Sequence, residues 1–493
     1  MSLHRTLRWL LILAAICAVV WISTIIYWQE TRRAVDEGDV ARFIIGLPLV
    51  LFGATLTLWL GAQALLRRTR TGITPAVQAP STNAIASDAE APSHFRIAIL
   101  GATAATPSGD AAAVLAALQN PDKLTAPAAS AFYDDEGFRI PLFRLNSLDT
   151  ADVAQWHQHW HEHTDPSPDG GANAPSERLL RSLSLLIAPL DEACELLADV
   201  LQPTPATTLP PTLVRPSAQA PPVAAPSPPR VQALVLTPSE TPEPALRALQ
   251  AFVESRLQTW LLESPAHVTL SAPTARNGTD IISTLHQMLA NDNGHRGRNV
   301  VLLIGTDSLV DESIVNRLMG SGQLATARRP EGITPGEGAF VVAFAAESLA
   351  PALATAYLHQ PARAQRMQPA DVGSKVVADA LQQALQNACS NAQQDASACA
   401  ALIVDGNGRG RRAVEAAQAM TFALDHLDAV ADRLDSGALL GELGAAQFPA
   451  LLTIAATFAT EQQQACAVAA LSPAIDRDVF IIAPALPQAT ATA

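Results

Sequence analysis

The chain has 493 residues, a formal net charge of -14, 49% hydrophobic residues and only 16% charged residues. This much apolar material is enough for a large core and excludes a chain that is disordered throughout. The acidic balance argues against nucleic acid as a partner, because phosphate binding needs clustered Lys and Arg. Beyond the short run at residues 67–70, the sequence has no such cluster.

Two apolar segments, residues 9–28 and 43–66, contain no charged side chain. Each is long enough to cross a hydrocarbon core of roughly 30 Å as a helix. A cleaved signal peptide is the alternative for the first segment, but the segment is too long, and no small-x-small site precedes the aromatic and charged stretch 27–33. We therefore expect residues 1–70 to form a transmembrane hairpin.

The charges that flank these segments predict the orientation of the hairpin. Five arginines lie outside the two segments and three lie in the loop between them: Arg5, Arg8, Arg67, Arg68 and Arg70, against Arg32, Arg33 and Arg42. This bias favours the cytoplasm for both ends of the hairpin. The five cysteines, Cys17, Cys194, Cys389, Cys399 and Cys466, form no CxxC pair and fit free thiols in a reducing compartment. The expected location is the bacterial inner membrane, with the soluble domain in the cytoplasm.

Buried-strand and helical patterns alternate through the rest of the chain. The expected strands are 96–101, 231–236, 299–305, 339–344, 400–405 and 479–483, and the expected helices are 110–119, 244–262, 280–291, 311–318, 371–389, 413–427 and 444–460. Apolar strands that alternate with helices predict an α/β domain with a mostly parallel or mixed sheet. Residues 71–93 have the composition of a flexible linker, and the Pro-rich stretch 203–229 that of an exposed insertion.

Several motifs occur in an order typical of one known fold. They are Thr106-Pro107-Ser108-Gly109, Gly305-Thr306-Asp307-Ser308, Pro335-Gly336-Glu337-Gly338-Ala339, Asp405-Gly406-Asn407-Gly408 and Gly441-Glu442-Leu443-Gly444-Ala445-Ala446. This set resembles the thiolase-like fold of β-ketoacyl synthases. The resemblance implies a layered α/β/α domain with an N-terminal half at 94–345, a C-terminal half at 346–484 and a tail at 485–493.

The enzymes of that family use a Cys at a helix start and two His, or His and Asn, for thioester chemistry. The stretch that precedes Val300 contains Ser283 and Thr284 but no Cys, and Gly441 and Glu442 stand where the second His motif is expected. Residues 405–408 replace the first His motif. From these replacements we predict that the chain is not an enzyme, with no catalytic residue and no cofactor.

The layout of this chain, with a membrane hairpin in front of such a domain, also resembles the membrane-anchored adapters of type VI secretion lipases. The sequence motifs at 135–138 and 140–142 resemble those adapters too. This resemblance implies a non-catalytic binding module whose partner is a lipase effector or a component of the secretion spike. Two alternatives stay open. One is a divergent acyl-binding or acyl-transferring enzyme at the membrane with Ser in place of Cys, and the other is a structural membrane protein that forms a homodimer through this fold.

Two further patterns suggest ligands. His157 and His161, like His159 and His163, lie four residues apart and would share a helix face, which suits a metal ion. We favour solvated histidines on an amphipathic helix and predict no metal site, because no partner at typical spacing completes one. The glycines of 406–410 do not match a phosphate-binding loop and predict a turn before a helix, which leaves Arg409, Arg411 and Arg412 to face an acidic partner. Asp307 and Glu337 are expected to fix loops.

Overall fold

The computed structural model describes residues 95–120, 128–164, 175–201, 230–260, 266–271, 277–290, 299–346, 353–372, 375–406 and 409–485. The predicted hairpin, the linker, the Pro-rich insertion and all but the first residue of the tail lie outside these ranges. Among the described residues, no helix combines the length and the hydrophobicity that crossing a bilayer requires.

The strands are β1 (Arg96–Ala105), β2 (Ala128–Tyr133), β3 (Arg139–Leu142), β4 (Arg230–Leu236), β5 (Ala266–Ser271), β6 (Asn299–Ser308), β7 (Glu337–Ala345), β8 (Ala356–His359), β9 (Ala362–Gln365), β10 (Cys399–Val404), β11 (Arg433–Asp435), β12 (Ala465–Ala470) and β13 (Asp476–Pro484). The helices are α4 (Ala111–Gln119), α5 (Ala151–Thr164), α6 (Glu177–Leu201), α7 (Glu243–Trp260), α8 (Gly278–Ala290), α9 (Glu312–Gly320), α10 (Asp379–Asn391), α11 (Gly410–Ala423), α12 (Ser436–Leu440) and α13 (Gln447–Gln462), with a short 3₁₀ turn, η6 (Gly444–Ala446).

The large sheet contains the same strand arrangement twice. Its order is β11-β10-β12-β13-β8-β1-β7-β6-β4-β5. When the five strands of each half are numbered along the chain, both halves have the order 3-2-4-5-1. In both halves the fifth strand runs antiparallel to the fourth, and the second, third and fourth strands are parallel. The pairing of β1 with β8 joins the halves into one mixed sheet, which confirms the predicted mixed α/β architecture.

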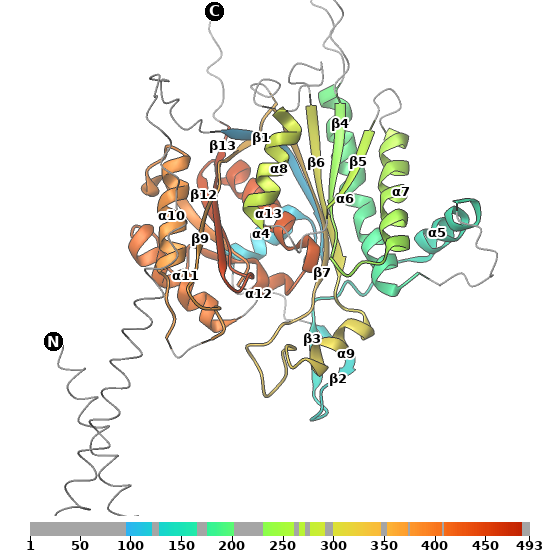
Figure 1. Ribbon diagram of the computed structural model, residues 1–493, viewed down its shortest axis with the longest axis horizontal. Helices are drawn as coiled ribbons and strands as arrows, with labels where there is room; N and C mark the ends of the chain where they lie inside the picture. The colour runs from blue at the N-terminus through green and yellow to red at the C-terminus, as the bar shows by residue number, and fades with distance from the viewer. Residues whose placement is uncertain are drawn as a thin grey trace, which may run out of the picture. The chain divides into compact units, whose positions relative to one another are not determined.

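Helices cover both faces of the large sheet (Figure 1), and three hydrophobic cores lie between the helices and the sheet. The central core contains residues of α4, α8 and α13 and the inner face of both sheet halves. Helices α6 and α7 cover the outer face of the first half, and α10 and α11 that of the second. Along the fully buried β6, Val300 and Leu302 belong to the outer core, and Val301 and Leu303 belong to the central one. This alternation is what a strand covered on both faces requires.

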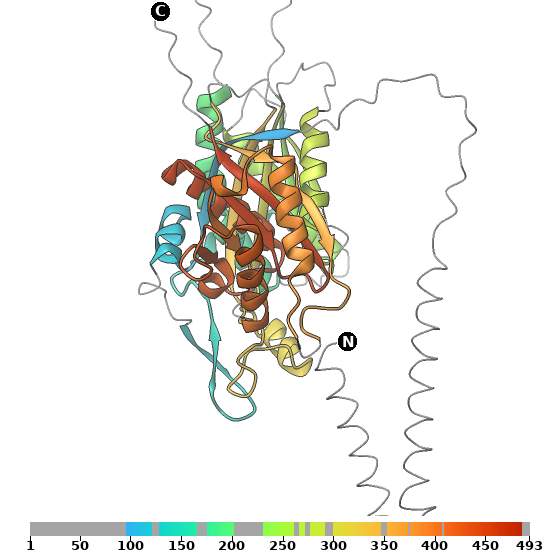
Figure 2. The same ribbon diagram turned by 90° about the vertical axis from the view of Figure 1, so that its left-hand side faces the viewer.

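A small lobe projects from one end of the sandwich (Figures 1 and 2). It consists of the β2–β3 hairpin, α9 and the segment 321–336. A separate apolar cluster fixes it, and its buried members are Ile140, Leu142, Val310, Val315 and Leu324. The Phe143 amide also donates to the carbonyl of Pro335 at 3.0 Å. The β2–β3 hairpin is therefore anchored by side-chain packing and by a backbone hydrogen bond.

Three predicted helices differ from the observed ones by three residues or more. The helix expected at 413–427 is α11, which begins at Gly410 and ends at Ala423. The helix expected at 371–389 begins only at Asp379, because Asp371 lies in a loop where its carboxylate accepts a hydrogen bond from Arg412 at 3.1 Å. The helix expected at 444–460 is divided into η6 and α13. Gly444 has a φ of +55°, and a Cβ there would strike the carboxylate of Asp307. Glycine is thus the residue that fits this close approach.

Candidate functional site

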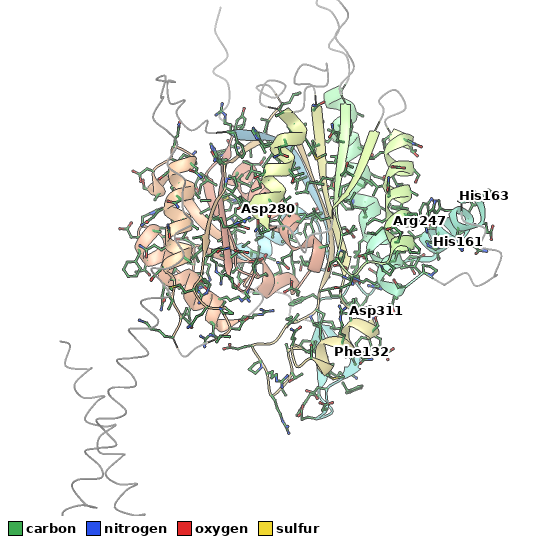
Figure 3. All side chains as sticks on the ribbon, viewed as in Figure 1. Phe132, His161, His163, Arg247, Asp280 and Asp311 are labelled. Carbon is green, nitrogen blue, oxygen red and sulfur yellow. The ribbon has the colours of Figure 1, made fainter. Side chains whose placement is uncertain are left out.

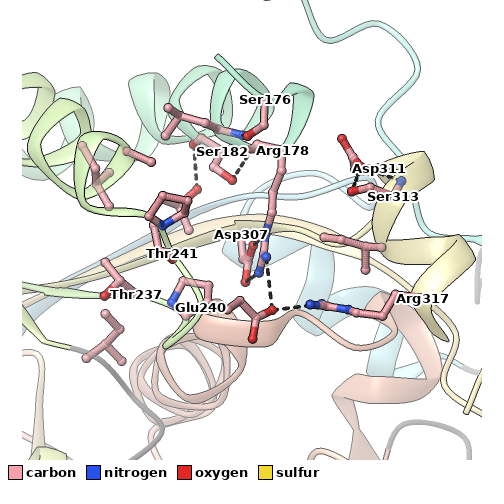
Figure 4. Close-up of a pocket in the computed structure, with 18 residues that line it drawn as sticks. Ser176, Arg178, Ser182, Thr237, Glu240, Thr241, Asp307, Asp311, Ser313 and Arg317 are labelled. Atoms are coloured by element: carbon pink, nitrogen blue, oxygen red, sulfur yellow. Dashed lines mark hydrogen bonds and ion pairs between the residues drawn. The ribbon is translucent and has the colours of Figure 1, made fainter. Parts of the chain in front are cut away.

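A cavity of about 420 Å³ opens at the carboxyl ends of β4 and β6 (Figure 4). In the first half, α7 follows β4 on the outer face of the sheet, whereas α8 precedes β6 on the inner face. Ligands of open α/β sheets bind in the crevice that such a change of face creates. The walls of the cavity come from β4, β6 and the first turns of α6, α7 and α9. The apolar lining includes Leu179, Leu236, Ala245, Leu249 and Ile314.

Charged side chains form one wall of this cavity. Arg178 makes two bonds with Asp307, Nε to Oδ1 at 2.8 Å and Nη2 to Oδ2 at 2.9 Å. Glu240 bridges Arg178 at 3.5 Å and Arg317 at 2.9 Å. Burial alone would lower the pKa of Arg178, but the bonds and the charge of Asp307 outweigh it and the pKa is raised. The four side chains therefore form a continuous chain of alternating charge (Figure 4).

Asp307 also connects the cavity to the second half of the domain. Its Oδ2 accepts the backbone N–H of Ala445 at 3.0 Å, and its Oδ1 accepts that of Ser308 at 2.9 Å. Behind it, the fully buried Glu337 accepts the N–H of Leu145 at 2.7 Å and pairs with Arg181 at 2.5 Å. Both carboxylates thus hold loops in place, as the sequence predicts.

The segments that resemble the family's catalytic motifs meet between the two halves. Asp405, at the end of β10, is buried, and its carboxylate accepts the backbone N–H groups of Leu471 and Ser472. Glu442 lies in the segment between α12 and η6, where its N–H donates to the carbonyl of Thr334 at 2.8 Å. Burial raises the pKa of Glu442 to about 7, and Asp405 adds to the rise whereas Arg409 opposes it. Burial therefore disfavours the charged forms of both Asp405 and Glu442, and raises the pKa of each.

Ser283 and Thr284 do not lie at a helix start. Helix α8 begins at Gly278, so both residues are inside the helix, and their hydroxyls donate to the carbonyls of Thr279 at 2.8 Å and Asp280 at 2.9 Å. Residues 272–276, which precede α8, lie outside the described residues. The fold thus gives neither hydroxyl the helix-start position that the acyl-transfer alternative requires.

A second cavity, of about 490 Å³, lies where the projecting lobe meets the start of α11. Four arginines line it together with two carboxylates: Arg328, Arg329, Arg409 and Arg411, with Glu331 and Asp371. Nη2 of Arg411 is buried without a hydrogen-bond partner among the described residues. The predicted turn before a helix is found here, with α11 beginning at Gly410. The sequence indicated Arg409 and Arg411 but not the arginines at 328 and 329, which the fold brings to the same place. Arg412 was also expected to face a partner, and that expectation is wrong: its side chain is buried, with 1% exposed, and pairs with Asp371 at 3.1 Å.

The histidine-rich segment forms α5, as its pattern predicts. Trp156 packs edge-to-face on Phe252 with a centroid distance of 4.9 Å, and Trp160 stacks on Trp156 at 6.0 Å. His159 and His163 are exposed. Among the described cysteines, Cys194, Cys389, Cys399 and Cys466 are free and buried.

Comparison with known proteins gives no matching family model and no matching curated protein. Solved structures do match. The ketosynthase from module 6 of the bacillaene synthase of Bacillus subtilis 168 is similar over 80% of this chain and 73% of its own, with 10% identity and a TM-score of 0.50. A β-ketoacyl synthase from Burkholderia phymatum aligns over 79% of this chain and 99% of its own, with 14% identity and a TM-score of 0.46.

This similarity overturns one prediction. The chain was expected not to be an enzyme because its motif positions lack the family's Cys and His, and that prediction is wrong: the fold matches ketosynthase enzyme domains. At 10% identity, motif positions aligned by sequence alone do not determine which side chains carry chemistry. The described domain has the ketosynthase, or thiolase-like, fold.

Proposed function

We propose that this ketosynthase-like domain binds an acidic protein partner, and that the partner is a lipase effector of a type VI secretion system. The observation that carries the proposal is a group of aromatic and arginine side chains on the projecting lobe and at the start of α11, which lines the same cavity. We call it the hairpin–arginine surface and define it by Tyr133, Phe138, Arg328, Arg329, Arg409 and Arg411.

Three features support partner binding at this surface. Phe138 is 60% exposed and Tyr133 52% exposed, although both stand on a hairpin with a packed base. A salt bridge of 2.9 Å from Arg328 to Glu136 connects the hairpin to the arginine-lined cavity. Aromatic and arginine side chains are the types enriched at the energetic centres of interfaces.

Charge complementarity indicates the chemistry of the partner. The cavity has four arginines and two carboxylates, whereas the whole chain has a net charge of -14. The arginines would attract an acidic surface of a partner. Away from them, the net negative charge makes two copies of this chain repel each other. The segment 135–142, on which the resemblance to lipase adapters rests, forms part of this lobe.

The test is the affinity of the full chain for the lipase effector. We expect Phe138→Ala to weaken binding about tenfold or more, as loss of an interface anchor does. Phe422→Ala is the matched control, because Phe422 is 68% exposed on α11. Arg409→Glu combined with Arg411→Glu should also weaken binding and reduce its salt dependence, whereas Arg247→Glu on α7 should not. A pulldown that recovers only fatty-acid metabolism proteins would count against an adapter.

A second candidate, acyl binding or acyl transfer, is favoured by the apolar lining of the cavity at β4 and β6. Acyl transfer predicts a mass increase of the intact chain after incubation with an acyl thioester, because a hydroxyl that lines the cavity would attack the thioester carbonyl, form an ester and release the thiol as its C–S bond breaks. A variant that fills the cavity, Ala245→Leu, should then reduce that adduct. An unchanged mass would argue against acyl transfer.

A further inference from the structure

The outer end of α5 contains a group of potential metal ligands that partner binding does not use. His159, Glu162 and His163 are all exposed, and their ligand atoms lie within 4.8 Å of one another. Residues three and four apart are neighbours on a helix face, which explains the grouping. Figure 3 shows His161 and His163 at the tip of α5, beyond α7 and away from the sheets.

The helix that presents these ligands is held in place. Its Trp156 packs against Phe252 of α7, and Trp160 stacks on Trp156. Val153 is buried in the outer core of the first half. The three ligands therefore share one rigid element, so little ordering is needed when an ion binds.

Hydrogen bonds already orient two of the three side chains. The Nδ1 atom of His163 lies 2.8 Å from the carbonyl oxygen of His159. Since a carbonyl only accepts, Nδ1 carries the proton in this contact, and the lone pair of the neutral ring is on Nε2. The amide Nε2 of Gln158 donates to Oε1 of Glu162 at 3.0 Å. Metal-binding histidines and carboxylates typically have such supporting contacts.

We propose that His159, Glu162 and His163 bind a divalent transition-metal ion, zinc first among them. Two imidazole nitrogens and one carboxylate oxygen are a ligand set that suits Zn²⁺, and solvent would complete its coordination. The proposal is independent of the hairpin–arginine surface, which lies on a different lobe.

The neighbouring pair on the same helix provides a built-in comparison. The rings of His157 and His161 are 6.3 Å apart between centroids, whereas those of His159 and His163 are 4.2 Å apart. His157 is also half-buried beside Trp160, with a centroid distance of 5.8 Å. Among the residues that the structure describes, no carboxylate completes the first pair, which has the same spacing in sequence but is only partly exposed.

The test is a titration of the full chain with Zn²⁺ in competition with a chromogenic chelator, at a pH near 7.5. We expect one tightly bound ion per chain. The double variant His159→Ala/His163→Ala should raise the apparent Kd about tenfold or more, and Glu162→Gln should raise it by less. The matched double variant His157→Ala/His161→Ala should leave Kd within a factor of about two to three. Circular dichroism of each variant checks that the helix content is unchanged.

A spectroscopic measurement identifies the ligands. Cu²⁺ bound at the site should show nitrogen superhyperfine splitting in electron paramagnetic resonance, and only the His159→Ala/His163→Ala variant should lose it. Equal loss of affinity in both double variants, or no stoichiometric ion in the wild-type chain, would overturn the proposal.

Discussion

Replacing Arg181 with methionine is expected to lower the free energy of unfolding by about 3–5 kcal/mol, the cost of leaving a buried charge without its partner. Arg181 is 4% exposed and Glu337 is 0% exposed, and two hydrogen bonds join them, at 2.8 Å and 2.5 Å. Methionine fills similar space but leaves the Glu337 carboxylate uncompensated. Urea denaturation followed by fluorescence measures the difference.

Two further variants make this expectation specific. Arg181→Met combined with Glu337→Gln should recover much of the lost stability, because the amide oxygen is uncharged and still accepts the Leu145 N–H. Arg317→Met is the matched control, since the Arg317–Glu240 pair is about half exposed, with 54% and 50% of each side chain accessible. Arg317→Met should lower the free energy of unfolding by less than about 1 kcal/mol. Similar losses of unfolding free energy for Arg181→Met and Arg317→Met would contradict the stabilising role of the buried Arg181–Glu337 pair.

Glu442→Gln is expected to stabilise the domain at pH 8 and to have little effect near pH 4.5. Burial raises the pKa of Glu442 from 4.5 to about 7, so between these values the folded state binds more protons than the unfolded state. The wild-type stability from this group is therefore complete below pH 4.5 and is lost as the pH rises through 7. The full shift corresponds to about 3 kcal/mol. Glutamine does not titrate and removes this loss.

The measurement is the difference in unfolding free energy between variant and wild type from pH 4.5 to pH 8. The difference isolates Glu442 from Asp435, whose pKa burial also raises, to about 6. The control is Glu461→Gln, at the exposed end of α13 and away from the buried segment that holds Glu442. A difference curve for Glu442→Gln that is flat, or that falls with pH, would show that Glu442 is ionised at little cost.

The sequence predicted the strands that are buried on both faces better than it predicted the elements around them. The runs at 299–305 and 339–344 are continuous and apolar, and both are found in β6 and β7. Helix α6 was missed because Pro189 stands inside it. In the structure, Thr103 Oγ1 donates to the Pro189 carbonyl at 2.7 Å, a contact between residues far apart in sequence that no local pattern contains. Ala-rich β12 is a strand because β10 and β13 flank it.

The candidate site was predictable only in its acidic half. Asp307 and Glu337 stand in recognisable turn motifs, and their roles as loop-fixing acceptors are confirmed by the bonds to Ala445 and Leu145. Their partners Arg178 and Arg181 come from α6, more than a hundred residues earlier in the chain. Glycines mark a turn in sequence, but they do not indicate which arginine the fold brings to it.

Hydrogen–deuterium exchange of the full chain, with and without a lipase effector as the proposed partner, tests the central claim most directly. The account predicts slower exchange on binding in peptides that cover 133–139, 322–333 and 409–412, because these segments form the hairpin–arginine surface. Exchange in α7 and α10, on the outer faces, should be unchanged. Protection confined to those outer helices, or no protection at a saturating effector concentration, would contradict the account.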